Sequence, residues 1–196
     1  LALQKMMEEE YADEMSIRKI FAGGGPYDPI TMFDVFVEIN ESENPPTVPL
    51  TIVGIDYAEQ LNLNYVNIFK EPLLSNYKEW FISKEYSLGQ LRRLLDSDKL
   101  TDFMHPDMFT EDTNEDFKKV REALKKNSLI EWTPKAPIVI VHGVNDTAVP
   151  FISGQQAYEA FKSRNCPVEF REIKGDHKET AIPFYLIVLQ ELVLKQ

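Results

Sequence analysis

The sequence is poor in cysteine and histidine. Cys166 is the single cysteine among 196 residues, and the chain has three histidines. One cysteine cannot form a disulfide within the chain, and one cysteine with widely spaced histidines does not provide the ligand spacing of a zinc cage. We therefore expect neither a disulfide framework nor a structural zinc site, and we expect Cys166 to be inert.

Basic residues are also scarce. Lysine and arginine number 21 against 32 aspartates and glutamates, which gives a net charge of −11. A surface this negative repels phosphate backbones, and the densest basic segment, residues 118–126, is interleaved with acids. The composition argues against nucleic acid as a partner.

No long hydrophobic run is present. The best candidate, residues 181–194, contains Pro183, Gln190 and Glu191 and is shorter than the roughly 20 residues that a bilayer requires. We expect no transmembrane segment, and no signal peptide is recognisable. The chain begins with Leu1 and enters an uncapped helical pattern at once, so we expect it to be a piece of a longer protein.

Both ends of the sequence show an α/β pattern. Apolar residues repeat every fourth position over a predicted helix at 1–15, and a predicted strand at 17–22 ends in the glycine turn 23–26. A continuous β-branched run at 137–141 is typical of a strand covered on both faces of a parallel sheet. A helix at 153–163, an alternating, edge-like strand at 167–173 and a helix at 180–195 follow.

The middle of the sequence differs in character. Residues 40–49 have the composition of a loop, and residues 50–69, 71–83 and 88–95 are predicted to be helices. A capping box at 113–116 opens a further helix that runs to Lys126. The aromatic residues of this region are interpreted first as internal packing and second as the wall of an acyl tunnel; they are Phe69, Tyr77, Trp80, Phe81 and Tyr86.

Two loops hold side chains that could take part in acid–base chemistry. Asp146 lies in the loop at 142–150, and His177 lies in the turn after the next predicted strand. Ligands of open α/β sheets bind at the carboxyl ends of the strands, where both loops are expected. A carboxylate there can orient an imidazole and stabilise its cation, which leaves the second ring nitrogen free to accept a proton.

The segment from Pro137 to Pro150, followed by a helix, a strand and Gly175-Asp176-His177, resembles the C-terminal half of an α/β-hydrolase. The resemblance implies that Asp146 is the triad acid and His177 the general base. It implies a partial α/β-hydrolase fold: a three-stranded edge of the parallel sheet from residues 1–29 and 131–196, with a helical cap at 30–130. The glycine turn and helical insertion resemble secretory lipases, so the resemblance implies a small-molecule ester substrate and no cofactor, and is compatible with a secreted or periplasmic location.

The nucleophile of that family is absent from the sequence. It sits in G-x-S-x-G, and none of the eight glycines forms that motif here. The oxyanion hole, which depends on the same segment, is absent too. We therefore expect the missing N-terminal half of the same protein, or a partner copy, to complete the site. The strand at 17–22 should then lie at a sheet edge, with Leu3 and Met7 exposed.

Other residues have simpler interpretations. His142 ends a buried strand and is interpreted as a packed, hydrogen-bonded histidine, and His105 as a loop residue of the cap. Asp176 and Glu179 are interpreted as solvent-exposed neighbours of His177, each an alternative for the acid. The glycines at 23–25 lack the spacing of a phosphate-binding loop and indicate a turn.

The leading hypothesis is a serine carboxylester hydrolase. One alternative is a capped serine aminopeptidase, which would bind a substrate amine with acidic residues of the cap. Another is a non-catalytic relic or binding module. The acidic residues in question are Glu41, Glu43, Asp56, Glu59, Glu71 and Glu79.

Overall fold

The computed structural model describes residues 1–110 and 114–193. The chain divides into two compact units, which are described separately: residues 1–32 with those from 128 onward (unit 1), and residues 33–127 (unit 2). Thr113 of the predicted capping box and the last two residues of the predicted helix at 180–195 lie outside the described residues. No helix in the described ranges is long and apolar enough to cross a membrane.

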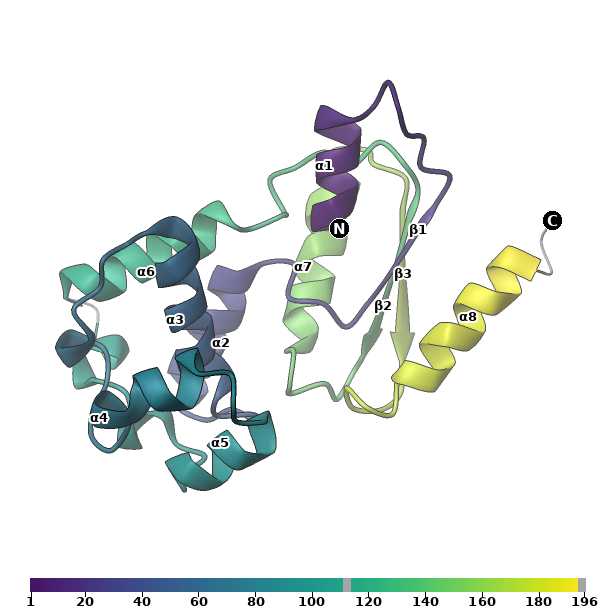
Figure 1. Cartoon of the computed structure of the whole chain (residues 1–196). Coiled ribbons are helices and arrows are strands. Elements are labelled where there is room, and N and C mark those ends of the chain that lie inside the picture. The colour runs from purple at the N-terminus through teal and green to yellow at the C-terminus, as the bar shows by residue number, and fades with distance from the viewer. Residues whose placement is uncertain (111–113, 194–196) are drawn as a thin grey trace. The chain divides into compact units, whose positions relative to one another are not determined.

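Unit 1 is built on a three-stranded parallel sheet (Figure 1). Its strands are β1 (Ile20–Gly23), β2 (Ile138–Gly143) and β3 (Val168–Ile173), in the order β1-β2-β3. Ala22 pairs with Ile140, which pairs with Phe170. Every residue of β2 is buried, whereas β3 has no buried residue and exposes two of its six. The predictions of a covered central strand and an edge-like last strand are therefore confirmed.

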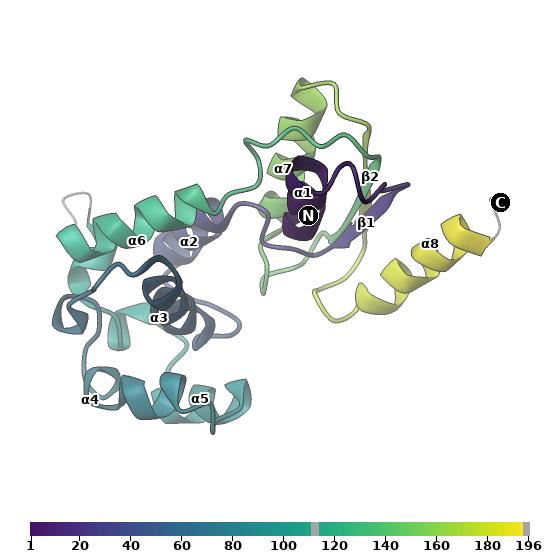
Figure 2. The ribbon, with the colours of Figure 1, turned by 45° about the horizontal axis from the view of Figure 1, so that its top comes forward.

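Three helices flank this sheet. They are α1 (Ala2–Glu10), α7 (Phe151–Ser163) and α8 (Ala181–Val193). In both views α1 and α7 lie on one side of the sheet and α8 on the other (Figures 1 and 2). Ala157 and Phe161 of α7 are fully buried with Ile138 and Ile140 of β2. Burying apolar side chains from the helix and the strand together forms the core of unit 1.

The first helix differs from the prediction. It ends at Glu10 rather than near residue 15, and its buried residues are Gln4 and Glu8. The Glu8 carboxylate accepts hydrogen bonds from the backbone N–H groups of Lys135 (2.8 Å) and Ala136 (2.9 Å), just before β2 begins. Because the buried Glu8 faces the start of β2, the apolar residues of α1 lie toward solvent. Leu3 is 63% exposed, as predicted, and Met7 is only half-buried.

Unit 2 is helical. Its helices are α2 (Pro29–Ile39, which begins in unit 1), α3 (Thr47–Glu59), α4 (Leu73–Tyr77), α5 (Leu88–Leu95) and α6 (Glu115–Lys126). A π-helical turn continues α4, and the short 3₁₀ turns are Tyr65–Asn67, Leu100–Asp102 and Pro106–Phe109. Among the fully buried side chains of unit 2 are Phe69, Leu73, Leu100 and Met104.

Two helices of this unit differ from the prediction. Helix α2 was not predicted, and the helix predicted over 50–69 begins at Thr47 and ends at Glu59. Gln60 ends α3 in the left-handed conformation with φ of 54°. The capping residue of α6 is Asn114, whose side chain accepts the Phe117 N–H at 3.0 Å. The prediction for 88–95 is confirmed at both ends.

The chain leaves and re-enters unit 1 at neighbouring points. The carbonyl of Tyr27 accepts a hydrogen bond from the N–H of Leu129 at 3.0 Å. The Ser153 hydroxyl of α7 accepts the Tyr27 N–H at 3.0 Å and donates to the Gly25 carbonyl at 3.1 Å. The start of α7 thus fixes the glycine turn in place.

Candidate active site

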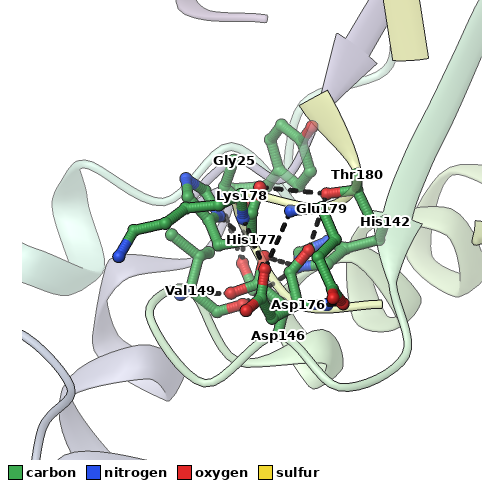
Figure 3. Close-up of polar contacts among 11 residues, drawn as sticks. Gly25, His142, Asp146, Val149, Asp176, His177, Lys178, Glu179 and Thr180 are labelled. Atoms are coloured by element: carbon green, nitrogen blue, oxygen red, sulfur yellow. Dashed lines mark hydrogen bonds and ion pairs between the residues drawn. The ribbon is translucent and has the colours of Figure 1, made fainter. Parts of the chain in front are cut away.

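Asp146 and His177 lie together at the carboxyl end of the sheet (Figure 3). Asp146 follows β2 and His177 follows β3, and these strands are paired neighbours. The distance from His177 Nδ1 to Asp146 Oδ2 is 2.7 Å. The predicted hydrogen bond between the two side chains is therefore confirmed. Because a carboxylate only accepts, Nδ1 carries the hydrogen, and the neutral ring has its lone pair on Nε2.

Asp146 is buried and multiply hydrogen-bonded. Its backbone N–H donates to the Gly143 carbonyl, and its Oδ1 accepts the Val149 N–H at 2.8 Å. Burial by itself would raise the pKa of the Asp146 carboxyl, but contacts with His142, the Val149 N–H and His177 outweigh it and lower the pKa below its ordinary value. The group is therefore an anion at neutral pH, as the partner of an imidazole must be.

The turn that carries His177 is held by its own side chains. Asp176 Oδ1 accepts the N–H groups of Lys178 and Glu179, each at 2.8 Å, and the Glu179 carboxylate accepts the Asp176 N–H at 3.0 Å. The Thr180 hydroxyl donates to the Asp176 carbonyl. The two alternatives for the acid are thus engaged with backbone, and Asp146 is the carboxylate that contacts the His177 ring.

Glycines allow the chain to approach this pair closely. Gly24 has φ of +47°, and a Cβ there would lie 3.2 Å from His177 Cε1 and 3.5 Å from Asp146 Oδ2. At Gly143, a Cβ would lie 2.6 Å from the Gly175 carbonyl oxygen. A side chain at either position would press on the pair or on its turn. The glycine motif at 23–25 is therefore a turn packed beside the site, as predicted.

A hollow of about 240 Å³ adjoins His177 within unit 1. Its lining includes Gly23, Val141, Thr180 and Phe184. The His177 side chain is 42% exposed, and its Nε2 has no hydrogen-bond partner among the described residues. The proton-accepting edge of the imidazole is therefore open to a group entering from solvent or from another segment.

His142 was underestimated from the sequence. It is fully buried, as predicted, but its Nε2 lies 3.0 Å from the Val149 carbonyl and 3.4 Å from Asp146 Oδ2 (Figure 3). The available signal was its position four residues before Asp146, at the end of the same strand. The structure thus surrounds one carboxylate with two imidazoles.

The remaining candidates have other hydrogen-bond partners or surroundings within their own units. His105 caps a 3₁₀ turn of unit 2 by accepting the Asp107 N–H. Cys166 is partly buried, and burial raises the pKa of its thiol, as an inert cysteine requires. Within the described ranges, no cluster of three histidine, cysteine or acidic side chains is placed to hold a metal ion.

No family model matches the sequence, and no curated protein matches it. Solved structures do. The rice cell wall degrading esterase LipA from Xanthomonas oryzae matches 99% of this chain over 55% of its own length, with a TM-score of 0.80 and 18% identity. A protein described as a candidate hydrolase from Legionella pneumophila matches 96% of this chain over 50% of its own (TM-score 0.75, 19% identity). Candida antarctica lipase A matches 95% of this chain over 44% of its own length, with a TM-score of 0.52 and 16% identity.

The chain has a partial α/β-hydrolase fold. It spans about half the length of the structures it matches. At this level of identity the likeness establishes the α/β-hydrolase fold. The α/β-hydrolase fold predicted from the sequence is confirmed, together with its three-stranded parallel sheet.

Proposed function

We propose that this chain is part of a serine carboxylester hydrolase of the esterase or lipase type, to which it contributes the acid Asp146 and the base His177. The observation that carries the proposal is the 2.7 Å bond from His177 Nδ1 to Asp146, with the His177 side chain partly exposed beside a hollow. The similarity of fold to an esterase and a lipase supports the same reaction class.

The geometry suits two proton transfers. As a serine hydroxyl attacks an ester carbonyl, Nε2 of His177 accepts the hydroxyl proton, and Asp146 stabilises the imidazolium through Nδ1–H. The imidazolium then donates that proton to the departing alkoxide, which leaves as an alcohol, and the acyl group stays on the serine. Water attacks the acyl-enzyme in the same way, with His177 again accepting and returning a proton, which releases the acid.

The serine and the oxyanion donors are proposed to lie outside these 196 residues, in an N-terminal half of the same protein or in a partner copy. Three features support this. The sequence lacks G-x-S-x-G, β1 pairs only with β2 among the described strands, and α8 exposes apolar residues such as Ile182 and Tyr185. An exposed strand edge and apolar helix face are suited to further strands and helices.

Unit 2 is proposed to act as the cap, within residues 30–130. It contains a hollow of about 530 Å³ lined mainly by apolar and aromatic side chains, including Val53, Tyr65, Tyr77 and Phe81. Such a lining suits an apolar group of a substrate. Phe69, Trp80 and Phe81 are buried, in agreement with the packing interpretation.

Four of the six acidic residues named above as possible amine ligands are already engaged by neighbouring side chains. Asp56 accepts from the Tyr65 hydroxyl, Glu59 pairs with Lys126, and Glu71 and Glu79 accept from Ser75 and Tyr86. Each of these four carboxylates is bonded to a neighbour in unit 2. The aminopeptidase alternative therefore serves as an outcome of the test rather than as a second proposal.

The test is hydrolysis of p-nitrophenyl esters by the protein that carries this chain, with aminoacyl p-nitroanilides in parallel. We expect ester hydrolysis, and His177→Ala should lower kcat by about three to six powers of ten, because triad members act as a unit. His105→Ala is the matched control and should leave kcat unchanged.

Three outcomes would contradict the proposal. An active ester hydrolase whose kcat survives His177→Ala would remove His177 as the base. Preference for the anilides would favour the aminopeptidase. A folded protein without either activity would be a relic or binding module.

A further inference from the structure

His142 makes polar contacts that packing alone does not require. Its Nε2 lies 3.0 Å from the Val149 carbonyl oxygen and 3.4 Å from Asp146 Oδ2. Because a carbonyl oxygen only accepts, Nε2 carries the hydrogen. The N–H edge of a buried ring is thus directed at the loop that holds the acid.

The ring has little freedom to move. Phe151 packs edge-on against it, with ring centroids 5.8 Å apart and an interplanar angle of 81°. The other ring nitrogen, Nδ1, faces Gly154 of α7, where an added Cβ would overlap the ring. Nδ1 is buried and has no hydrogen-bond partner among the described residues. The polar link of this histidine to its surroundings therefore runs through Nε2.

Val149 connects the histidine to the acid. Its carbonyl accepts from His142, and its N–H donates to Asp146 Oδ1 at 2.8 Å. Oδ1 is thereby fixed by the backbone, and Oδ2 is left between two imidazole nitrogens, at 2.7 Å from His177 and 3.4 Å from His142. The plane of the carboxylate is set by this closed arrangement of His142, Val149 and Asp146.

We propose that His142 is a positioning residue, which uses its Nε2–H to hold the Asp146 carboxylate in the orientation that accepts the Nδ1–H of His177. Its effect on catalysis rests on the proposed function, but its effect on the hydrogen bond does not. A ring that only filled space would need volume and no donor. The proposal therefore predicts that a side chain with an N–H donor at this position supports the Asp146–His177 hydrogen bond, and that an apolar side chain of similar size does not.

The experiment compares His142→Leu with His142→Gln in the protein that carries this chain. Leucine fills space without a donor, whereas the glutamine amide can place an N–H near the position of Nε2. The first readout is the Nδ1–H proton of His177 in NMR spectra, assigned by its absence in the His177→Ala variant. We expect its exchange with water to quicken about tenfold or more in the leucine variant, and glutamine to restore most of the protection.

The second readout is ester hydrolysis. Misplacing a catalytic group by about 1 Å can cost a hundredfold in rate, so we expect His142→Leu to lower kcat by about 10- to 100-fold with KM nearly unchanged. His142→Gln should recover most of that loss. Gly154→Ala, which keeps His142 but pushes on its ring, should move both readouts in the same direction, and it decides the matter if the leucine variant does not fold.

The two proposals fail in different ways. If the leucine variant has a lower melting temperature but keeps the His177 Nδ1–H signal and kcat of the parent, His142 is only a packing residue and this inference is overturned. If the Nδ1–H signal responds as expected but the parent does not hydrolyse esters, the positioning role stands and the proposed reaction fails.

Discussion

The two units of the chain bury their apolar side chains to different degrees. In unit 2, Phe69, Leu73 and Met104 from different segments are almost fully buried. In unit 1, α8 has no buried residue, and Ile182 is 72% exposed. Unit 2 does expose apolar residues such as Tyr57, but α3, which carries it, also has buried residues. An apolar helix such as α8 can therefore be predicted from the sequence, but the sequence does not reveal what covers its apolar face.

The difference also separates chemistry from packing. The paired Asp146 and His177 belong to the unit with the open apolar face, at the carboxyl end of its sheet. In unit 2 the polar groups mostly serve helix ends and neighbouring helices, as Asn114 does for α6. Variants placed in matched positions of the two units can break or sharpen this contrast.

The largest expected difference is between two apolar truncations. Phe69→Ala in unit 2 removes a buried ring that stacks on Tyr65 with centroids 5.2 Å apart, and should cost about 3–5 kcal/mol in the free energy of unfolding. In these 196 residues alone, Ile182→Ala on exposed α8 should change it by less than about 0.5 kcal/mol, whereas a cover supplied by the rest of the protein would raise that cost. Urea unfolding followed by circular dichroism measures both. A large cost at Ile182 would mean that this face of α8 is covered in solution.

A smaller difference in the free energy of unfolding is expected between alanine substitutions at two glycines. Gly143→Ala in unit 1 would place a Cβ 2.6 Å from a backbone oxygen, so it should cost about 1–3 kcal/mol and displace the turn that carries His177. Gly54→Ala in α3 meets no atom within 4 Å, and should stabilise unit 2 by about 0.5–1 kcal/mol because alanine favours the helix interior. Thermal unfolding distinguishes the two signs. Equal effects would contradict the close approach at Gly143.

The smallest expected difference is in how the stability of the two units depends on acidic pH. The pKa of Asp146 is lowered in the folded state from its ordinary value of 3.8, so its contribution to stability is present above about pH 4 and lost as the pH falls through the lowered pKa. Asp146→Asn should therefore cost about 1–2 kcal/mol at neutral pH and progressively less below pH 4.

Glu59 in unit 2 provides the control for this prediction. Its hydrogen bonds with Lys126 and Asn127 also lower its pKa, but it lies at the surface, so Glu59→Gln should show a weaker dependence on pH. Denaturant titrations at several pH values give both curves. A cost at Asp146→Asn that stays constant from pH 7 to pH 2 would argue against the buried anion.

Much of the fold could be predicted because local patterns agreed with the final packing. The β-branched run of β2, the helix predicted at 88–95 and the helix predicted to run to Lys126 each correspond to an observed element. Helix α3 ended earlier than predicted because Gln60 and Asn62 adopt positive φ, which apolar spacing does not reveal. The polar anchor Glu8 was missed because its partners, two backbone N–H groups, lie more than 120 residues away.

The site was predictable in its main pair but not in its support. Asp146 and His177 follow successive strands, and parallel strands bring their carboxyl ends to one edge. The contact of His142 with the loop depends on the fold of residues 143–149, which returns Val149 to the end of β2. Sequence spacing alone does not specify that return.

The hydrogen bond between Tyr27 and Leu129 has a consequence for how such a protein can vary. The chain leaves the sheet-bearing unit and comes back to it at adjacent points, held by one backbone bond and by the Ser153 hydroxyl. A segment inserted between neighbouring points can lengthen, shorten or diverge without changing the register of the strands on either side. We therefore expect changes in the length of residues 33–127 to leave the geometry of the Asp146 and His177 pair unchanged.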